Sequence, residues 1–105
     1  TVGFVVIDQI SSTVVRKLNV KGVLILEVEP RSPAAQAGVR GSRLLRDGSV
    51  IPGDVLQAID GVPVDSASAI DKVLDGKRIG DRVVLTLWRE GKAVQVAIVL
   101  AAEKR

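Results

Sequence analysis

The stretch GVLILEVEPRSPAAQAGV, residues 22–39, contains the signals of a strand and of a capped helix, one directly after the other. Its apolar first half predicts a strand over Val23–Val28, which a proline closes soon afterwards. Ser32 and Pro33 then supply an N-cap and a proline at the first helical position. The alanines that follow predict one or two helical turns, and Gly38 predicts their end.

Upstream of this stretch, the sequence predicts another strand and a short helix. The strand is the apolar run from Phe4 to Ile7. Ser11 or Ser12 caps the helix, whose apolar residues recur at helical spacing as far as Leu18. An asparagine and a glycine then end it.

Downstream, residues 39–53 have no clean hydrophobic period and predict a long loop. We expect this loop, which carries several arginines, either to be solvated or to contact a neighbouring domain or protomer. The run VLQAI after Asp54 predicts a strand, and Asp60 and Gly61 predict a tight turn into a further short strand.

The last part of the chain predicts one helix and one hairpin. Asp65 or Ser66 caps the helix, which ends at Gly76. RVVLTLW and AVQVAIVL form the hairpin around a Glu90-Gly91 turn. About five strands and two or three short helices predict an α+β, mainly β fold, a small antiparallel sandwich or partly open barrel.

Composition limits the function more sharply than it limits the fold. The 105 residues predict a single domain, residues 1–105, and they include no cysteine and no histidine. Disulfides, thiolate metal sites and a Ser-His-Asp triad are therefore excluded, and we expect no cofactor and no catalysis. Aromatic residues make up 2% of the chain, too few for a stacking platform, so we expect no nucleic-acid partner. No apolar run approaches the roughly 20 residues of a membrane-spanning helix, which predicts no membrane insertion.

The opening residues TVGF place Gly3 between two apolar residues. Such a triplet most often marks only a turn or a bulge in a buried strand. A functional interpretation is also open, because successive backbone N–H groups around a glycine can form an anion-binding nest. An extended peptide would then dock its terminal carboxylate in the loop and add itself to the edge of the following strand.

A peptide bound in this way needs a pocket for its terminal side chain. Val2 and Phe4 are candidates for one wall. Ala67, Ile70 and Leu74 share one face of the predicted helix and are candidates for the other wall. We therefore expect the ligand to end in an apolar residue.

Four motifs in this order resemble the PDZ domains that follow the protease domain in bacterial-type Deg/HtrA serine proteases. They are TVGF, GVLILEVEPRSPAAQAGV, PGDVLQAIDGVPV and AIDKVLDGKRIGDRVVLTLWREGK, which together span nearly the whole chain. The resemblance implies a PDZ-like fold with the permuted strand order of the protease-linked domains. It departs from the family at Asp71, where relatives often carry an apolar or aromatic residue, which makes one edge of the groove polar.

The resemblance also implies roles for individual residues. Main-chain N–H groups of Val2, Gly3 and Phe4 would hold a peptide carboxylate, and Val5, Val6 and Ile7 would pair with the peptide. Phe4, Ala67, Ile70 and Leu74 would line the apolar pocket.

By the same resemblance, the partner is a C-terminal or unfolded polypeptide with an apolar terminal residue, together with a protease domain of the same protein. The compartment is periplasmic or otherwise extracytoplasmic. Two alternatives stay open: a non-binding structural or oligomerisation domain, and a PDZ domain of another protease or of a secretion protein.

Overall fold

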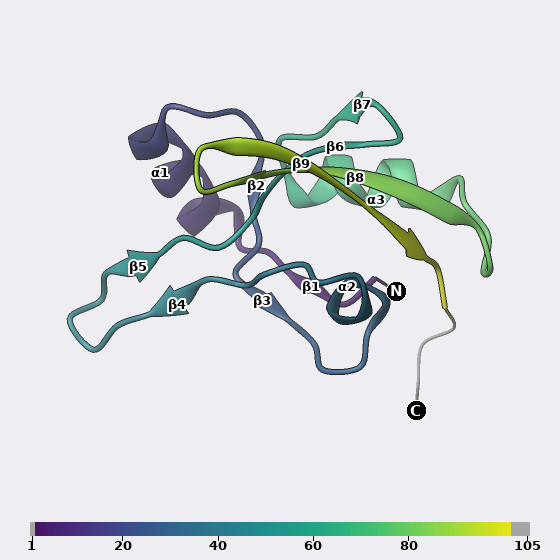
Figure 1. The fold of residues 1–105 in the computed structure, drawn as a ribbon. Coiled ribbons are helices and arrows are strands. Elements are labelled where there is room, and N and C mark those ends of the chain that lie inside the picture. The colour runs from purple at the N-terminus through teal and green to yellow at the C-terminus, as the bar shows by residue number, and fades with distance from the viewer. Residues whose placement is uncertain (1, 102–105) are drawn as a thin grey trace.

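The computed structural model describes residues 2–101, which form three helices and nine strands with antiparallel pairing throughout (Figure 1). The helices are α1 (Asp8–Leu18), α2 (Pro33–Gln36) and α3 (Ala67–Asp75). The strands are β1 (Phe4–Val5), β2 (Val23–Leu24), β3 (Glu27–Val28), β4 (Arg43–Leu44), β5 (Val50–Ile51), β6 (Val55–Ile59), β7 (Val62–Pro63), β8 (Arg82–Arg89) and β9 (Lys92–Val99). The predicted fold class is confirmed, although there are more and shorter strands than the five expected.

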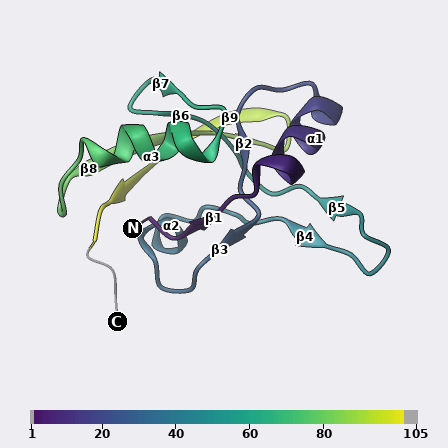
Figure 2. The same cartoon turned by 180° about the vertical axis from the view of Figure 1, so that it is seen from behind.

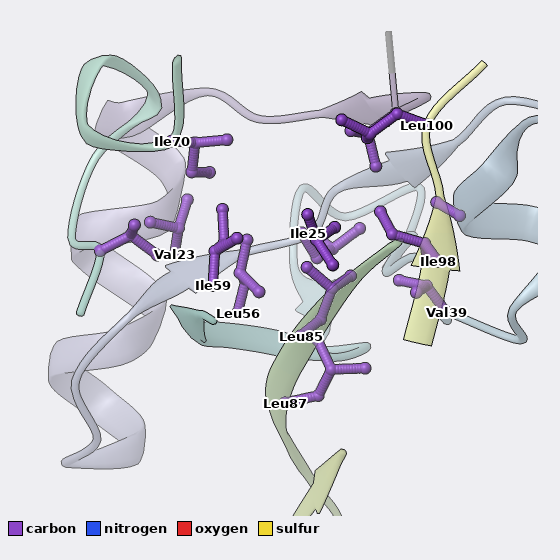
Figure 3. Packing of buried hydrophobic residues seen from close by; sticks show 14 residues of the cluster. Val23, Ile25, Val39, Leu56, Ile59, Ile70, Leu85, Leu87, Ile98 and Leu100 are labelled. Atoms are coloured by element: carbon purple, nitrogen blue, oxygen red, sulfur yellow. The ribbon is translucent and has the colours of Figure 1, made fainter. Parts of the chain in front are cut away.

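The main sheet has the order β2-β6-β8-β9, with β7 paired to β6. The predicted C-terminal hairpin is confirmed: β8 and β9 pair along their whole lengths around the Glu90–Gly91 turn, where both residues have positive φ. Alternate residues of β8 are buried, as period-two patterning requires. Leu85 and Ile98 from this hairpin pack with Ile70 of α3 in one hydrophobic core (Figure 3).

The predicted strand Val23–Val28 is wrong as a single element. Its first part, β2, pairs with β6, whereas its last part, β3, pairs with β1. The change of partner occurs at two consecutive amides: Ile25 donates to the Asp54 carbonyl, and Leu26 donates to the Val5 carbonyl. An unbroken apolar run cannot reveal such a change, since both halves are hydrophobic.

The helix after this strand is confirmed. Ser32 has extended backbone angles at the N-cap of α2, and its Oγ accepts a hydrogen bond from the Ala35 amide at 3.2 Å. Gly38 follows the helix with a φ of 83°, a left-handed conformation that glycine adopts without strain.

The serine caps predicted for the first helix are wrong. α1 begins at Asp8, earlier than expected, and its N-cap is Ile7. Ser11 lies inside the helix, where its buried Oγ accepts a hydrogen bond from the Leu24 amide at 2.9 Å. This early start also shortens the strand predicted over Phe4–Ile7 to the two residues of β1.

The third helix is capped by one of the two predicted residues. Ser66 is the N-cap, and its Oγ accepts a hydrogen bond from the Ala69 amide, whereas Asp65 is not the cap.

Residues 39–53 are not wholly a loop, because β4 and β5 pair in a short hairpin. The hairpin extends away from the rest of the molecule (Figure 1). Leu44 and Ile51 on this hairpin are 69% and 45% exposed. Because these strands do not pack against the core, their sequence lacks the alternation of apolar and polar residues that would have predicted them.

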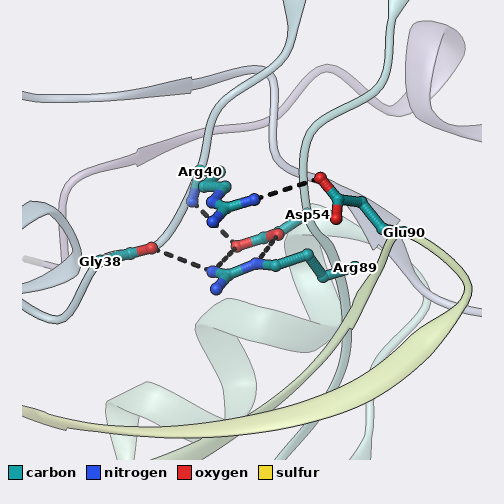
Figure 4. A network of polar contacts seen from close by, with 5 residues as sticks. All are labelled: Gly38, Arg40, Asp54, Arg89 and Glu90. Carbon is teal, nitrogen blue, oxygen red and sulfur yellow. Dashed lines mark hydrogen bonds and ion pairs between the residues drawn. The ribbon is translucent and has the colours of Figure 1, made fainter.

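Asp54 joins this region to the main sheet through a polar network (Figure 4). Its buried carboxylate accepts hydrogen bonds from Arg89 Nε at 2.8 Å, from Arg89 Nη2 at 2.7 Å and from the Arg40 amide at 2.9 Å. Arg89 also donates to the Gly38 carbonyl. The hydrogen bonds to Asp54 raise the pKa of the Arg89 guanidinium, because they stabilise its charged form. The network therefore holds the segment that follows α2, at Gly38 and Arg40, against Asp54 and Arg89.

Candidate functional site

The loop before β1 is held by its own backbone and by the cap of α2. The Val2 carbonyl accepts from the Ala34 amide at 3.0 Å, and the Gly3 carbonyl accepts from the Glu29 amide at 2.9 Å. Gly3 has a φ of 95°, and a Cβ atom at this position would overlap the side chain of Ser32. Glycine is therefore required here by the approach of Ser32, and hydrogen bonds within the chain hold the loop in this shape. Thr1, the first residue of the predicted loop, lies outside the described residues.

One edge of β1 is turned away from its partner strand. Phe4 is opposite Val28 and Val5 is opposite Glu27 in the pairing of β1 with β3. Because hydrogen bonding alternates along an antiparallel strand and the Gly3 carbonyl bonds to Glu29, the amide and carbonyl of Phe4 point to the opposite side. This second edge is available for another strand.

A groove lies along that edge. A cavity of about 420 Å³ is lined on one side by the segment from Val2 to Val6 and on the other by α3. The helix lies beside the N-terminal segment when the molecule is seen from behind (Figure 2). Ile70 of α3 is buried beneath the groove, and Phe4 and Leu74 are partly buried against the same core, so the groove has an apolar floor.

The helix runs antiparallel to β1 along this groove. Its first residue, Ala67, donates its amide to Asp8 Oδ1 at 2.9 Å, just beyond the end of β1. At the opposite end, the segment after α3 is held to the end of the sheet by the Gly80 amide, which donates to the Leu100 carbonyl at 2.8 Å. Leu100 lines the cavity together with Val2 and Gly3, so the C-terminal end of α3 lies at the glycine loop.

The structure brings most of the predicted site residues together. Val2, Gly3, Phe4, Val6, Ala67, Ile70 and Leu74 all line the one cavity. Val5 and Ile7 do not, since Val5 pairs with Glu27 on the far side and Ile7 is the N-cap of α1, 46% exposed. The pairing role predicted for Val5, Val6 and Ile7 therefore rests on an extended segment shorter than expected.

Sequence reasoning missed several other residues that line the groove. Ile79, Leu100 and Arg78 line the cavity but follow or lie far from α3 in the sequence. Asp75 also lines it and was not among the predicted site residues, although the helical spacing of Ala67, Asp71 and Asp75 was a signal that could have identified it.

Among residues 2–101, no group of acidic, histidine or cysteine side chains is arranged to hold a metal ion. None of the helices in that range has the length and apolar character needed to cross a membrane.

An antiparallel β-rich body with a groove between a short strand and a helix, closed at one end by a glycine loop, defines a PDZ-like fold. The chain belongs to the PDZ domain family, whose model matches residues 2–100.

Several relatives and two solved structures that match the chain are Do-like, DegP or HtrA-type proteases. It is 33% identical over 88 residues to Protease Do-like 8, chloroplastic, of Arabidopsis thaliana, a match that covers 83% of this chain and 20% of that protein. It is 31% identical over 80 residues to the periplasmic serine endoprotease DegP of Salmonella typhimurium, covering 76% of this chain and 14% of that protein. The structure of the HtrA-type protease AlgW S227A with decapeptide matches with a TM-score of 0.70 at 20% identity, over 99% of this chain and 29% of that one. The chain thus spans about a fifth or less of the curated relatives' length.

Proposed function

We propose that this domain captures the C-terminus or an extended segment of a polypeptide by adding it as a strand to β1. The observation that carries the proposal is the single groove that joins the glycine loop, the free edge of β1 and the apolar face of α3. In this binding mode, main-chain hydrogen bonds supply affinity and side-chain pockets supply specificity.

The terminal carboxylate binds at the glycine loop. Main-chain N–H groups of Val2, Gly3 and Phe4 are its donors, and the hydrogen bonds from Ala34 and Glu29 to this loop fix its shape beforehand. Preorganisation of this kind reduces the entropy lost on binding. Because the carboxylate lies at the start of β1, the peptide runs antiparallel to that strand.

The terminal side chain enters the apolar part of the groove. The side chains that line this part carry no hydrogen-bond donor or acceptor; they are Phe4, Ala67, Ile70 and Leu74. An apolar last residue is therefore favoured, because a polar side chain buried here would find no side-chain partner. A few main-chain bonds and one buried side chain correspond to roughly micromolar affinity, about 8 kcal/mol.

The larger context follows from the relatives. We infer that the domain belongs to a Deg/HtrA-type serine protease, in which it presents polypeptide substrate or regulates a protease domain of the same protein. The names of several relatives place them in the periplasm, and we infer an extracytoplasmic location for this protein as well.

Fluorescence anisotropy tests the binding mode. A labelled peptide that ends in valine with a free carboxylate is compared with the same peptide amidated; we expect micromolar binding of the acid and none of the amide. Leu74→Gln should weaken binding, whereas Ile51→Gln, on the exposed β5 outside the groove, should not. Equal binding of acid and amide, or no binding of either, would overturn the proposal and favour a structural or oligomerisation domain.

A further inference from the structure

Asp8 and Ala67 join the two walls of the groove by one hydrogen bond. Asp8 is the first residue of α1 and directly follows the wall that contains β1, whereas Ala67 is the first residue of α3. The Ala67 amide donates to Asp8 Oδ1 at 2.9 Å, so the start of α1 lies beside the start of α3 (Figure 2). Within residues 2–101, no other hydrogen bond connects residues 2–8 with α3.

The carboxylate of Asp8 does not cap its own helix. α1 has Ile7 at its N-cap, with no hydrogen bond from a capping side chain. α3 has a cap of its own, because Ser66 Oγ accepts from the Ala69 amide at 3.1 Å. The first amides of a helix have no acceptor inside the helix, and side chains or water satisfy them. Since water would satisfy the exposed Ala67 amide as well, the bond to Asp8 adds little to helix formation and instead fixes one wall against the other.

The hydrogen bonds that hold α3 elsewhere lead to the main sheet and not to β1. After the helix, the Gly80 amide donates to the Leu100 carbonyl at 2.8 Å, and before it, the Val64 amide donates to the Gln57 carbonyl at 3.2 Å. The cavity of about 420 Å³ lies between α3 and the wall that contains β1, so these two elements do not pack together along the groove. Asp8 is therefore the residue that links them directly at the end away from the glycine loop.

A peptide strand in this groove has to meet both walls at once. Its main chain pairs with β1 at a spacing of roughly 4.8 Å, which hydrogen bonding leaves little freedom to change. Its side chains then reach α3 only if the helix is held at a matching distance from β1. A helix held there before the ligand arrives reduces the entropy lost on binding.

We propose that Asp8 is a positioning residue of the groove, whose bond to the Ala67 amide sets the distance between β1 and α3 and thereby the affinity for peptide. This inference rests on the proposed peptide-binding function and goes beyond it, because Asp8 does not line the cavity. Asp8 acts through Ala67 and touches no ligand in this role.

Variants of the acceptor test this role with the free-carboxylate peptide that ends in valine. Asp8→Ala should weaken binding about fivefold, which is what the loss of one hydrogen bond typically produces. Asp8→Asn keeps an oxygen acceptor at the same place and should bind within about twofold of wild type. Asp65→Ala is the matched control and should leave the affinity unchanged. It removes an exposed carboxylate two residues before α3 that forms no hydrogen bond within residues 2–101.

A variant of the donor tests the same bond from the other wall. Ala67→Pro deletes the amide hydrogen at the first helical position, where proline is favoured. The extended backbone of Ser66 suits a residue that precedes proline. Ala67→Pro should weaken binding about as much as Asp8→Ala, and the double variant should bind no more weakly than either single variant, because both changes remove one bond. Urea denaturation of each variant shows that the protein used for binding is folded.

The outcomes separate this inference from the function on which it rests. If Asp8→Ala binds the peptide as tightly as wild type does, Asp8 does not position the groove and the peptide-binding function stands. If Asp8→Asn or Asp65→Ala loses as much affinity as Asp8→Ala, the hydrogen bond is not the cause and the inference is wrong. The same holds if the losses of Asp8→Ala and Ala67→Pro add up in the double variant. If wild type binds no peptide, both proposals are wrong.

Discussion

Gly3 and Ser32 face each other so closely that the side chain of Ser32 occupies the space that a Cβ atom on Gly3 would need. Ser32 is at the same time the N-cap of α2 and donates its hydroxyl to the Glu29 carbonyl at 2.7 Å. The helix cap therefore determines the shape of the loop at the end of the groove. This contact connects the stability of α2 to the shape of the loop at which we propose that a ligand carboxylate binds.

Gly3→Ala should lower the free energy of unfolding by about 1–3 kcal/mol, because it combines a positive φ with a collision. Part of this loss should vanish in a Ser32→Gly background, in which the collision is removed and the N-cap is only slightly weakened. A double-mutant cycle by urea denaturation measures the coupling. Strictly additive losses would mean that the two residues do not interact.

Arg89→Met should lower the free energy of unfolding by about 3–5 kcal/mol, because it leaves the Asp54 carboxylate buried without its cation. The side chain of Asp54 is only 1% exposed. Arg40→Met is the matched control: it breaks the exposed pair of Arg40 with Glu90, at 3.4 Å, and keeps the Arg40 amide, so we expect a loss below about 1 kcal/mol. Similar midpoints of urea unfolding for both variants would contradict this account of the network.

Ser11→Ala should lower the free energy of unfolding by about 1–3 kcal/mol, since the Leu24 amide loses its buried acceptor. Ser12→Ala changes the next residue of the same helix, where the hydroxyl is exposed and bonds only to the Gln9 carbonyl. We expect a change within about 0.5 kcal/mol for Ser12→Ala. Thermal unfolding of the two variants side by side measures the difference, and equal losses of stability would show that the buried bond to the Leu24 amide contributes nothing.

Acid should remove a contribution that Asp60 makes to stability. Its carboxylate accepts from the Val84 amide at 2.7 Å and from Lys77 Nζ at 2.9 Å, and these bonds lower the pKa of Asp60 from its ordinary value of 3.8. A depressed folded-state pKa means that the contribution is present above the unfolded-state pKa and is lost as the pH falls through the folded-state pKa.

Asp60→Asn is the variant that tests this pH dependence. Asparagine tolerates the left-handed backbone of this turn, where φ is 49°, and it removes the charge alone. We expect the stability difference between wild type and variant to be largest near neutral pH and to shrink below about pH 4. Urea midpoints measured from pH 7 to pH 3 give this difference, and a constant difference over the range would show that the carboxylate charge is not the cause.

Signals within a few residues predicted much of the fold. The cap at Ser32, the turns at Asp60-Gly61 and Glu90-Gly91 and the alternation of the final hairpin all appear where expected. Candidate pocket residues on α3 were also predictable, because helical spacing places Ala67, Ile70 and Leu74 on one face. Each of these features depends on contacts between residues that are close in the sequence.

Other features depended on partners far away in the chain. The apolar run after Gly22 was predictable, but the change of partner at Ile25 and Leu26 required Asp54 and Val5 to be in place. Ser11 matched a helix cap equally well, until the packing of α1 on β2 buried its hydroxyl beside the Leu24 amide. The missed end of the groove, at Ile79 and Leu100, exists only because the sheet brings the two segments together.

The amino-acid sequence by itself determined the local structure, the absence of triad and thiolate chemistry and the family, because caps, turns, spacing and composition act over short range. Only the tertiary structure decided which strand edge stays free and why residue 3 is glycine. It also decided which charges face the groove. These properties depend on hydrogen bonds and close contacts between residues that are far apart in the sequence, such as Gly3 and Ser32. The order of residues along the chain does not say how close such residues lie in space.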